Sequence, residues 1–289
     1  MIVVIYYSLV ADADGTRERQ WARSVESLRR HNAHISVVLC LYGSARPETL
    51  ATAGRFGVRV QPMGSFADAF GDVPRHWRNA LATLPTLHKL LSLHSLVTAD
   101  AIDRFIYLDC DTYFFDDVAN LAMRYDRCDW YARESYPDEQ ALAEIAHHEG
   151  LVLVPAFNSG VMVLSGVLAH TLVTLLDDFV WYAWRLLLGI CLWSPEVLGN
   201  PALAELVRAR SSEGERRLAL PYPSDNFWIM DEIATCLTLG RVPGLTHDLL
   251  RQDDVIQGDE YPEPSDTTIV VHYFSSRERQ FLARIGYGL

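Results

Sequence analysis

Short apolar runs and longer amphipathic segments alternate along the first sixty residues. The short runs lack polar alternation and are typical of strands that are covered on both faces. In the first amphipathic segment, Trp21, Val25 and Leu28 lie on one helical stripe. This βαβαβ order predicts a mainly parallel sheet with right-handed crossovers. We expect strands at 2–8, 35–42 and 58–60 and helices at 17–30 and 47–56.

A further apolar run, residues 105–108, ends at two acids, Asp109 and Asp111. In an extended chain these side chains would point the same way and Cys110 the other. Two carboxylates this close raise each other's pKa unless a cation such as Mg²⁺ or Mn²⁺ lies between them. Ligands of open α/β sheets bind beyond the carboxyl ends of the strands. The pattern favours a metal site, and a strand that simply ends in a turn is the alternative.

Three other segments place a polar residue beside an apolar pattern. Lys89 interrupts an amphipathic helix expected at 84–96, where its ammonium group either reaches solvent or faces a ligand. Asn158 precedes an apolar strand, a position that asparagine also occupies where an ordinary turn enters a strand. Ser224 is suited to cap a helix that ends near a glycine, and Asp225 would favour the helix dipole.

Residues 167–193 form the one long apolar stretch, which charged residues interrupt. Its uninterrupted part is far shorter than the roughly 20 residues that a membrane span requires. Trp181, Trp184 and Leu188 recur at helical spacing. We expect them to pack in the core, with an acceptor surface or a dimer face as alternatives.

The whole chain sets broader limits. Its 289 residues are near the upper range for one domain. A formal charge of −12 argues against non-specific binding of polyanions. Five scattered cysteines without a Cys-x-x-Cys pair predict neither a disulfide framework nor a zinc site. No basic segment precedes the apolar start, so we expect no signal peptide and a cytoplasmic protein without a transmembrane span.

The Asp-x-Asp pair, the segment Phe157-Asn-Ser-Gly-Val and a C-terminal Val-Val-His occur in this order along the chain. Together they resemble nucleotide-sugar-dependent glycosyltransferases of the GT-A fold, most closely glycosyltransferase family 8. The resemblance implies an α/β fold with a mainly parallel mixed sheet flanked by helices. One catalytic domain would span 1–289, with a nucleotide-binding half at 1–117 and an acceptor-side half at 118–289. The second half would contain a helical insertion near 167–222.

The resemblance also implies a metal site. Asp109, Asp111 and His272 would hold Mn²⁺ or Mg²⁺, although a lone histidine is usually structural. Lys89 matches a basic residue that reaches the donor in this family. An arginine, either Arg277 or Arg279, would add positive charge near the diphosphate.

The remaining site residues follow from the same resemblance. The loop that begins at Ser8 would hold the base of the donor, most simply uridine in a UDP-sugar. Asn158 and Ser159 would face the sugar. Asp225 and Asn226 match an Asp-Gln pair that lies on the reacting face of the sugar. The implied reaction moves that sugar to an unknown acceptor with retention of configuration. Inversion would instead require a carboxylate base, Asp225 or Asp231.

Three other functions compete with this hypothesis. A phosphohydrolase of the haloacid dehalogenase type also uses Asp-x-Asp with Mg²⁺, but normally on the first strand and followed by Thr or Val where Tyr113 stands here. A nucleotidyltransferase would need a basic, Gly-rich loop after the first strand, which is absent. A non-catalytic sugar-binding relative would not need all the proposed ligands. The acceptor class and a homo-oligomeric state are left open.

Overall fold

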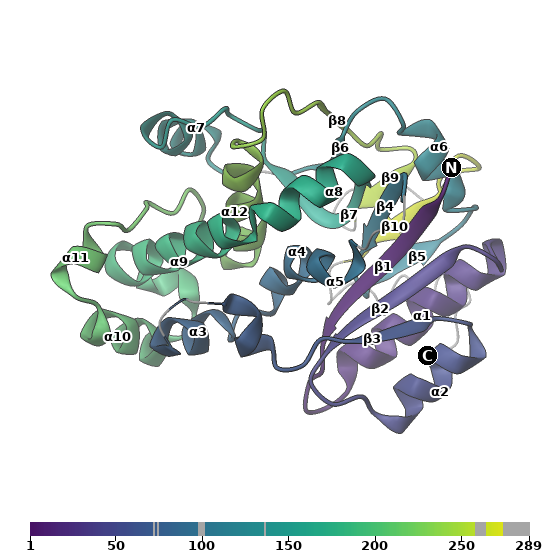
Figure 1. Cartoon of the computed structure of the whole chain (residues 1–289), viewed down its shortest axis with the longest axis horizontal. Helices are drawn as coiled ribbons and strands as arrows, with labels where there is room; N and C mark the ends of the chain where they lie inside the picture. The colour runs from purple at the N-terminus through teal and green to yellow at the C-terminus, as the bar shows by residue number, and fades with distance from the viewer. Residues whose placement is uncertain (72, 74, 98–101, 136, 258–263, 274–289) are drawn as a thin grey trace.

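The computed structural model describes residues 1–71, 73, 75–97, 102–135, 137–257 and 264–273. Within them, seven strands form the main sheet (Figure 1). They are β1 (Val3–Val10), β2 (Ser36–Tyr42), β3 (Arg59–Pro62), β4 (Arg104–Leu108), β6 (Trp130–Glu134), β7 (Phe157–Ser165) and β8 (His247–Leu249). Their order is β3-β2-β1-β4-β7-β6-β8. Neighbouring strands are parallel except that β7 runs antiparallel to β4 and β6.

Helices cover both faces of this sheet (Figure 1). The α-helices are α1 (Thr16–His31), α2 (Pro47–Arg55), α3 (Arg75–Leu81), α4 (His88–Leu91), α5 (Leu93–Leu96), α6 (Ala119–Arg124), α7 (Glu139–His148), α8 (Gly166–Thr174), α9 (Leu176–Trp193), α10 (Pro201–Arg210), α11 (Glu213–Arg216) and α12 (Met230–Leu239). The 3₁₀ turns are η1 (Phe66–Phe70), η2 (Pro85–Leu87), η3 (Pro195–Leu198) and η4 (Phe227–Ile229).

Alternation along β1 divides the core in two. Ile5 and Tyr7 pack on one face with Trp21 of α1, whereas Tyr6 packs on the other with residues of α9 and α12. Successive side chains of a strand point to opposite faces, so a continuous apolar run is required when both faces are covered. The expected strands and helices of the first sixty residues are confirmed to within two residues.

A second, smaller sheet brings the end of the described chain to the main sheet. It contains β5 (Thr112–Phe114), β10 (Val270–His272) and β9 (Val255–Gln257) in the order β5-β10-β9. Residue His272 pairs with Thr112, and the backbone N–H of Tyr273 donates to the carbonyl of Asp111 at 3.0 Å. This pairing fixes His272 beside the two acids that follow β4.

Two expected helices differ from the structure. Residues 84–96 form η2, α4 and α5 instead of one helix. Ser92 lies between α4 and α5, and its hydroxyl donates to the carbonyl of His88 at 2.9 Å. Back-bonding of this kind competes with the helical hydrogen bonds and bends the chain.

Among the described residues, no helix combines the length and the apolar character needed to cross a bilayer.

The helix expected at Ser224 begins later. Ser224 accepts a hydrogen bond from the N–H of Asn226 at 2.9 Å, and Asn226 then caps η4 by accepting from the N–H of Trp228 at 3.1 Å. The α-helix itself starts at Met230 and is followed by Gly240. The expected N-cap role of Ser224 is therefore wrong, and the expected end of the helix is confirmed.

Candidate active site

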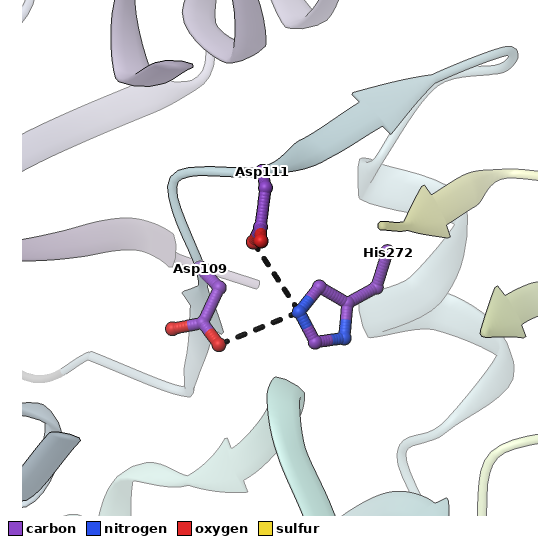
Figure 2. A group of neighbouring side chains, drawn as sticks. All are labelled: Asp109, Asp111 and His272. Carbon is purple, nitrogen blue, oxygen red and sulfur yellow. Dashed lines mark ion pairs between the residues drawn. The ribbon is translucent and has the colours of Figure 1, made fainter. Parts of the chain in front are cut away.

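Asp109, Asp111 and His272 converge at the carboxyl end of β4 (Figure 2). The Nε2 atom of His272 lies 3.5 Å from Oδ2 of Asp109 and 3.3 Å from Oδ1 of Asp111. One potential ligand atom from each residue lies within 4.8 Å of the others. Two carboxylate oxygens and one imidazole nitrogen are a donor set that suits Mn²⁺ and is acceptable to Mg²⁺. The three residues therefore fit a divalent ion.

The chain reaches this geometry through a turn. The N–H of Thr112 donates to the carbonyl of Asp109 at 3.3 Å, so the segment between β4 and β5 is not extended. Strand alternation therefore does not explain why Asp109 and Asp111 lie close together, because the extended chain that it requires is absent here. The tight turn and the pairing of β5 with β10 bring the carboxylates together.

The pKa shifts of His272 and Asp109 are those expected where negative charge gathers at a site for a cation. Burial acts to lower the pKa of His272, but Asp111 and Asp109 outweigh it and raise that pKa to about 9. Burial acts to raise the pKa of Asp109, but Lys89 and His272 hold it well below its usual value. A bound divalent ion would supply the positive charge that the protonated imidazole otherwise provides.

Gly160 of β7 makes room for the histidine. A methyl group at this position would lie 2.0 to 2.6 Å from ring atoms of His272. Real side chains do not approach so closely, so the ring can lie here only against a residue without Cβ. The backbone of Gly160 also accepts a hydrogen bond from the N–H of Asp109 at 2.8 Å. One glycine thus contacts both ends of the proposed metal site.

Lys89 is buried rather than directed to solvent. Its Nζ lies 3.1 Å from Oδ2 of Asp109 and 3.3 Å from Oδ2 of Asp231, and it donates to Oγ of Ser159 at 2.6 Å. Burial acts to lower the pKa of Lys89, but Asp109, Asp231 and Glu232 outweigh it, so the ammonium stays charged. The structure therefore places a permanent positive charge beside a proposed metal ligand.

Asn158 and Ser159 lie inside β7 and not before it. The pairing of β7 with β6 shifts between Ala132 and Arg133, opposite these residues. There the N–H of Ser159 donates to Oε1 of Glu232 at 3.1 Å instead of to a strand. Asn158 accepts from the N–H of Gly160 at 3.0 Å. An irregularity of this kind turns side chains toward a site.

The first turn of α12 contributes two buried carboxylates, Asp231 and Glu232. Asp231 accepts from the hydroxyl of Ser159 at 2.9 Å, and Glu232 accepts from the hydroxyl of Ser135 at 2.7 Å. Burial and the charge of Asp231 raise the pKa of Glu232 to about 7. Glu232 was not among the residues expected from the sequence. The signal for it was an adjacent pair of acids at the start of an apolar helix.

Most of these groups line one cavity of about 720 Å³. It is lined by Asp109, Asp111, His272, Lys89, Asn158 and Glu232 together with the exposed residues Asp225, Asn226 and Trp228. Arg17, Gln20, Thr86, Glu134, Ser135, Gly160, Ser224, Ile229 and Gln257 complete its wall. Most of the latter lie on surface turns or helices, where the local sequence carries no signal for a site.

A smaller cavity of about 190 Å³ adjoins the first and shares seven lining residues with it. Ser8 lines this smaller cavity but lies within β1, two residues before its end, so the loop that was expected to begin at Ser8 begins later. The hydroxyl of Ser8 donates to the carbonyl of His88 at 3.2 Å and contacts the hydroxyl of Ser92. The two expected arginines, Arg277 and Arg279, lie outside the described residues.

Comparisons with known proteins identify the fold. No protein-family model matches the chain, and no curated protein sequence is similar to it. Among solved structures, mouse xyloside xylosyltransferase 1 is similar over 96% of this chain and 98% of its own, with a TM-score of 0.54 and 13% identity. An active-site mutant of LgtC is similar over 98% and 95%, with a TM-score of 0.53 and 12% identity. The bifunctional glycosyltransferase WbbM is similar over 98% of this chain and 49% of its own, with a TM-score of 0.51 and 11% identity.

These neighbours are GT-A glycosyltransferases, and the likeness covers nearly the whole chain. The predicted α/β GT-A fold is therefore confirmed. The narrower resemblance to family 8 and the division into two halves remain predictions.

Proposed function

We propose that this protein is a metal-dependent glycosyltransferase that uses a nucleoside-diphosphate sugar, most simply a UDP-sugar. The observation that carries the proposal is the convergence of Asp109, Asp111 and His272 in a large cavity of a GT-A fold. Solved structures with this fold include a xylosyltransferase and a bifunctional glycosyltransferase. Fold alone does not determine activity, so the proposal depends on the chemistry of the site.

The three ligands would hold Mn²⁺ or Mg²⁺ at the diphosphate of the donor. A bound ion would neutralise the negative charge that develops as the nucleoside diphosphate departs from the anomeric carbon. Lys89 provides a second, buried positive charge next to Asp109, close enough to assist the same leaving group. Either Arg277 or Arg279 would add a further charge there.

The sugar would lie across the opposite part of the cavity. Asn158 lines the cavity and offers its amide nitrogen, since its side-chain oxygen accepts from the N–H of Gly160. Asp225 and Asn226 stand on the rim, where the transferred sugar would meet the acceptor. Ser159 is buried between Lys89 and the carboxylates and would position these charges. Ser8 would mark the side of the nucleotide base.

The phosphohydrolase alternative requires a carboxylate that is free to attack phosphorus. Asp109 instead lies at the end of β4, paired with Lys89 and His272. These contacts favour the role of a metal ligand over that of a nucleophile.

A panel of nucleotide sugars, tested with Mn²⁺, Mg²⁺ or EDTA, examines the proposal. We expect a UDP-sugar to be hydrolysed slowly without acceptor, and UDP with Mn²⁺ to raise the unfolding temperature. At a hundredfold excess over Kd, binding stabilises the native state by about 2.7 kcal/mol. Asp111→Asn should remove most of this shift and most of the activity. Full turnover in EDTA would refute the metal dependence.

The same reaction mixtures report stereochemistry. We propose retention, and NMR of the first-formed product from an α-linked donor should show an α-linkage. A β-linked product would instead indicate inversion, with Asp225 or Asp231 as the base.

A further inference from the structure

Trp228 is exposed at the rim of the large cavity. It keeps 64% of its surface accessible, more than Trp181 or Trp193 of α9. It also lines the smaller cavity beside Ser8, so it stands where the two cavities meet. A large aromatic side chain in water at a cavity mouth is a feature of binding surfaces.

Hydrogen bonds fix the backbone that presents this indole. The N–H of Trp228 donates to Oδ1 of Asn226 at 3.1 Å. The hydroxyl of Tyr222 donates to the carbonyl of Asn226 at 2.9 Å, and Oγ of Ser224 accepts from the N–H of Asn226 at 2.9 Å. The N–H of Asp138 donates to the carbonyl of Pro223 at 2.8 Å. The ring is therefore carried by an ordered turn, which lowers the entropy lost on binding.

Two polar residues precede Trp228 on the same turn and also line the cavity. Within the described part of the chain, the carboxylate of Asp225 has no hydrogen-bond or ion-pair partner, and the amide nitrogen of Asn226 has none either. A carboxylate accepts and an amide nitrogen donates. The rim thus combines a flat apolar surface with one acceptor and one donor.

A pyranose ring has complementary chemistry, because its C–H groups form an apolar face while its hydroxyls project from the edge. We propose that Trp228, Asp225 and Asn226 form the acceptor subsite and that the acceptor is a saccharide whose ring stacks on the indole. This inference rests on the proposed function, since it assumes that the buried part of the cavity holds the donor.

Charge and position support a neutral sugar as the occupant. The groups that suit a metal and a diphosphate are less exposed, whereas Trp228 keeps 64% of its surface accessible to a second substrate. Among the residues that line the cavity, acids outnumber Arg17 and Lys89, so Asp225 and Glu134 would disfavour an anionic acceptor. An uncharged, hydroxylated ring avoids this repulsion.

The test compares Trp228→Ala and Trp228→Phe with Trp193→Ala, which removes a tryptophan that is 57% exposed on α9. Saturation-transfer NMR with a panel of neutral mono- and disaccharides, in the presence of UDP and Mn²⁺, detects binding directly. Transfer from the UDP-sugar to the saccharides that bind is then measured. We expect Trp228→Ala to lose the NMR signal and to lower kcat/KM for the saccharide roughly tenfold or more, mainly through KM. Trp228→Phe should retain most of both, and Trp193→Ala should resemble the wild type.

Protection from unfolding by UDP and Mn²⁺ distinguishes a failure of the acceptor inference from a failure of the donor assignment. If the wild type shows this protection but binds and uses no saccharide, the acceptor inference is wrong and the donor assignment stands. If Trp228→Ala loses the protection itself, the indole contacts the donor and the acceptor subsite is refuted. If the wild type shows no protection and no donor turnover while saccharides still bind at Trp228, the proposed transferase function fails and a sugar-binding surface remains. Absence of both refutes both.

Discussion

Gly160 determines where His272 can lie, because its missing Cβ leaves the space that the imidazole ring fills. We predict that Gly160→Ala displaces the ring and weakens metal binding without preventing folding. The Mn²⁺-dependent rise in unfolding temperature should largely disappear, as after loss of a ligand. Differential scanning fluorimetry with and without Mn²⁺ measures this effect.

Gly214→Ala is the matched control, since a Cβ there would meet only Oγ of Ser212 at 4.0 Å. That variant should keep the full metal-dependent shift. An unchanged shift in Gly160→Ala would show that the ring of His272 is not needed for the ion.

Glu232 links stability to pH. Its pKa of about 7 in the folded protein exceeds the ordinary value of 4.5, so the folded state holds more protons between these values. The free energy of unfolding should therefore decrease as pH rises through this window. Glu232→Gln cannot ionise and keeps an oxygen for the N–H of Ser159. Relative to the wild type it should gain stability from pH 5 to pH 8, by up to roughly 3 kcal/mol.

Urea unfolding in EDTA at both pH values measures this difference. Glu205→Gln, which changes an exposed acid of α10, serves as the control. Parallel pH dependence in the wild type and in Glu232→Gln would contradict the prediction.

At the scale of elements, α9 depends on a close backbone contact. A Cβ at Gly189 would lie 1.7 Å from the carbonyl oxygen of Leu220. Alanine favours a helix by about 1 kcal/mol over glycine, but the clash forces the packed segments apart. We predict that Gly189→Ala lowers the free energy of unfolding by about 1–3 kcal/mol. Chemical denaturation measures the change.

Gly54→Ala provides the opposite case in α2, because nothing lies within 4 Å of the added methyl group. There the helix propensity should dominate and stability should rise by up to about 1 kcal/mol. Equal effects of the two substitutions would show that the contact of α9 with Leu220 is not restrictive.

Local patterns were sufficient to predict some strands but not the division of one helical segment. Apolar runs predicted β1, β2 and β4, because a strand that is buried on both faces is a continuous apolar run in the sequence itself. Residues 84–96 kept a helical apolar pattern, yet the hydroxyl of Ser92 bonds to His88 and divides the segment. Side-chain to backbone bonds of this kind depend on the surrounding packing, so periodicity alone does not detect them.

At the scale of the molecule, the site is assembled from distant parts of the chain. The acids follow β4, the histidine ends β10, and Lys89 comes from α4. The pairing of β10 with β5 and the antiparallel placement of β7 beside β4 bring these groups together. The large cavity at this edge then combines them with the turn that carries Trp228.

Local residue patterns predicted the α/β fold class and the strand-end acids, and short segments that resemble a known family suggested Lys89, Asn158 and His272 as candidates. The folded arrangement was needed to learn that Lys89 is buried between carboxylates, that Asp225 and Asn226 are exposed where they line the cavity, and that Glu232 lines it as well. The physical reason is that burial and through-space charge arise from contacts between segments far apart in the chain, and local residue patterns do not encode those contacts.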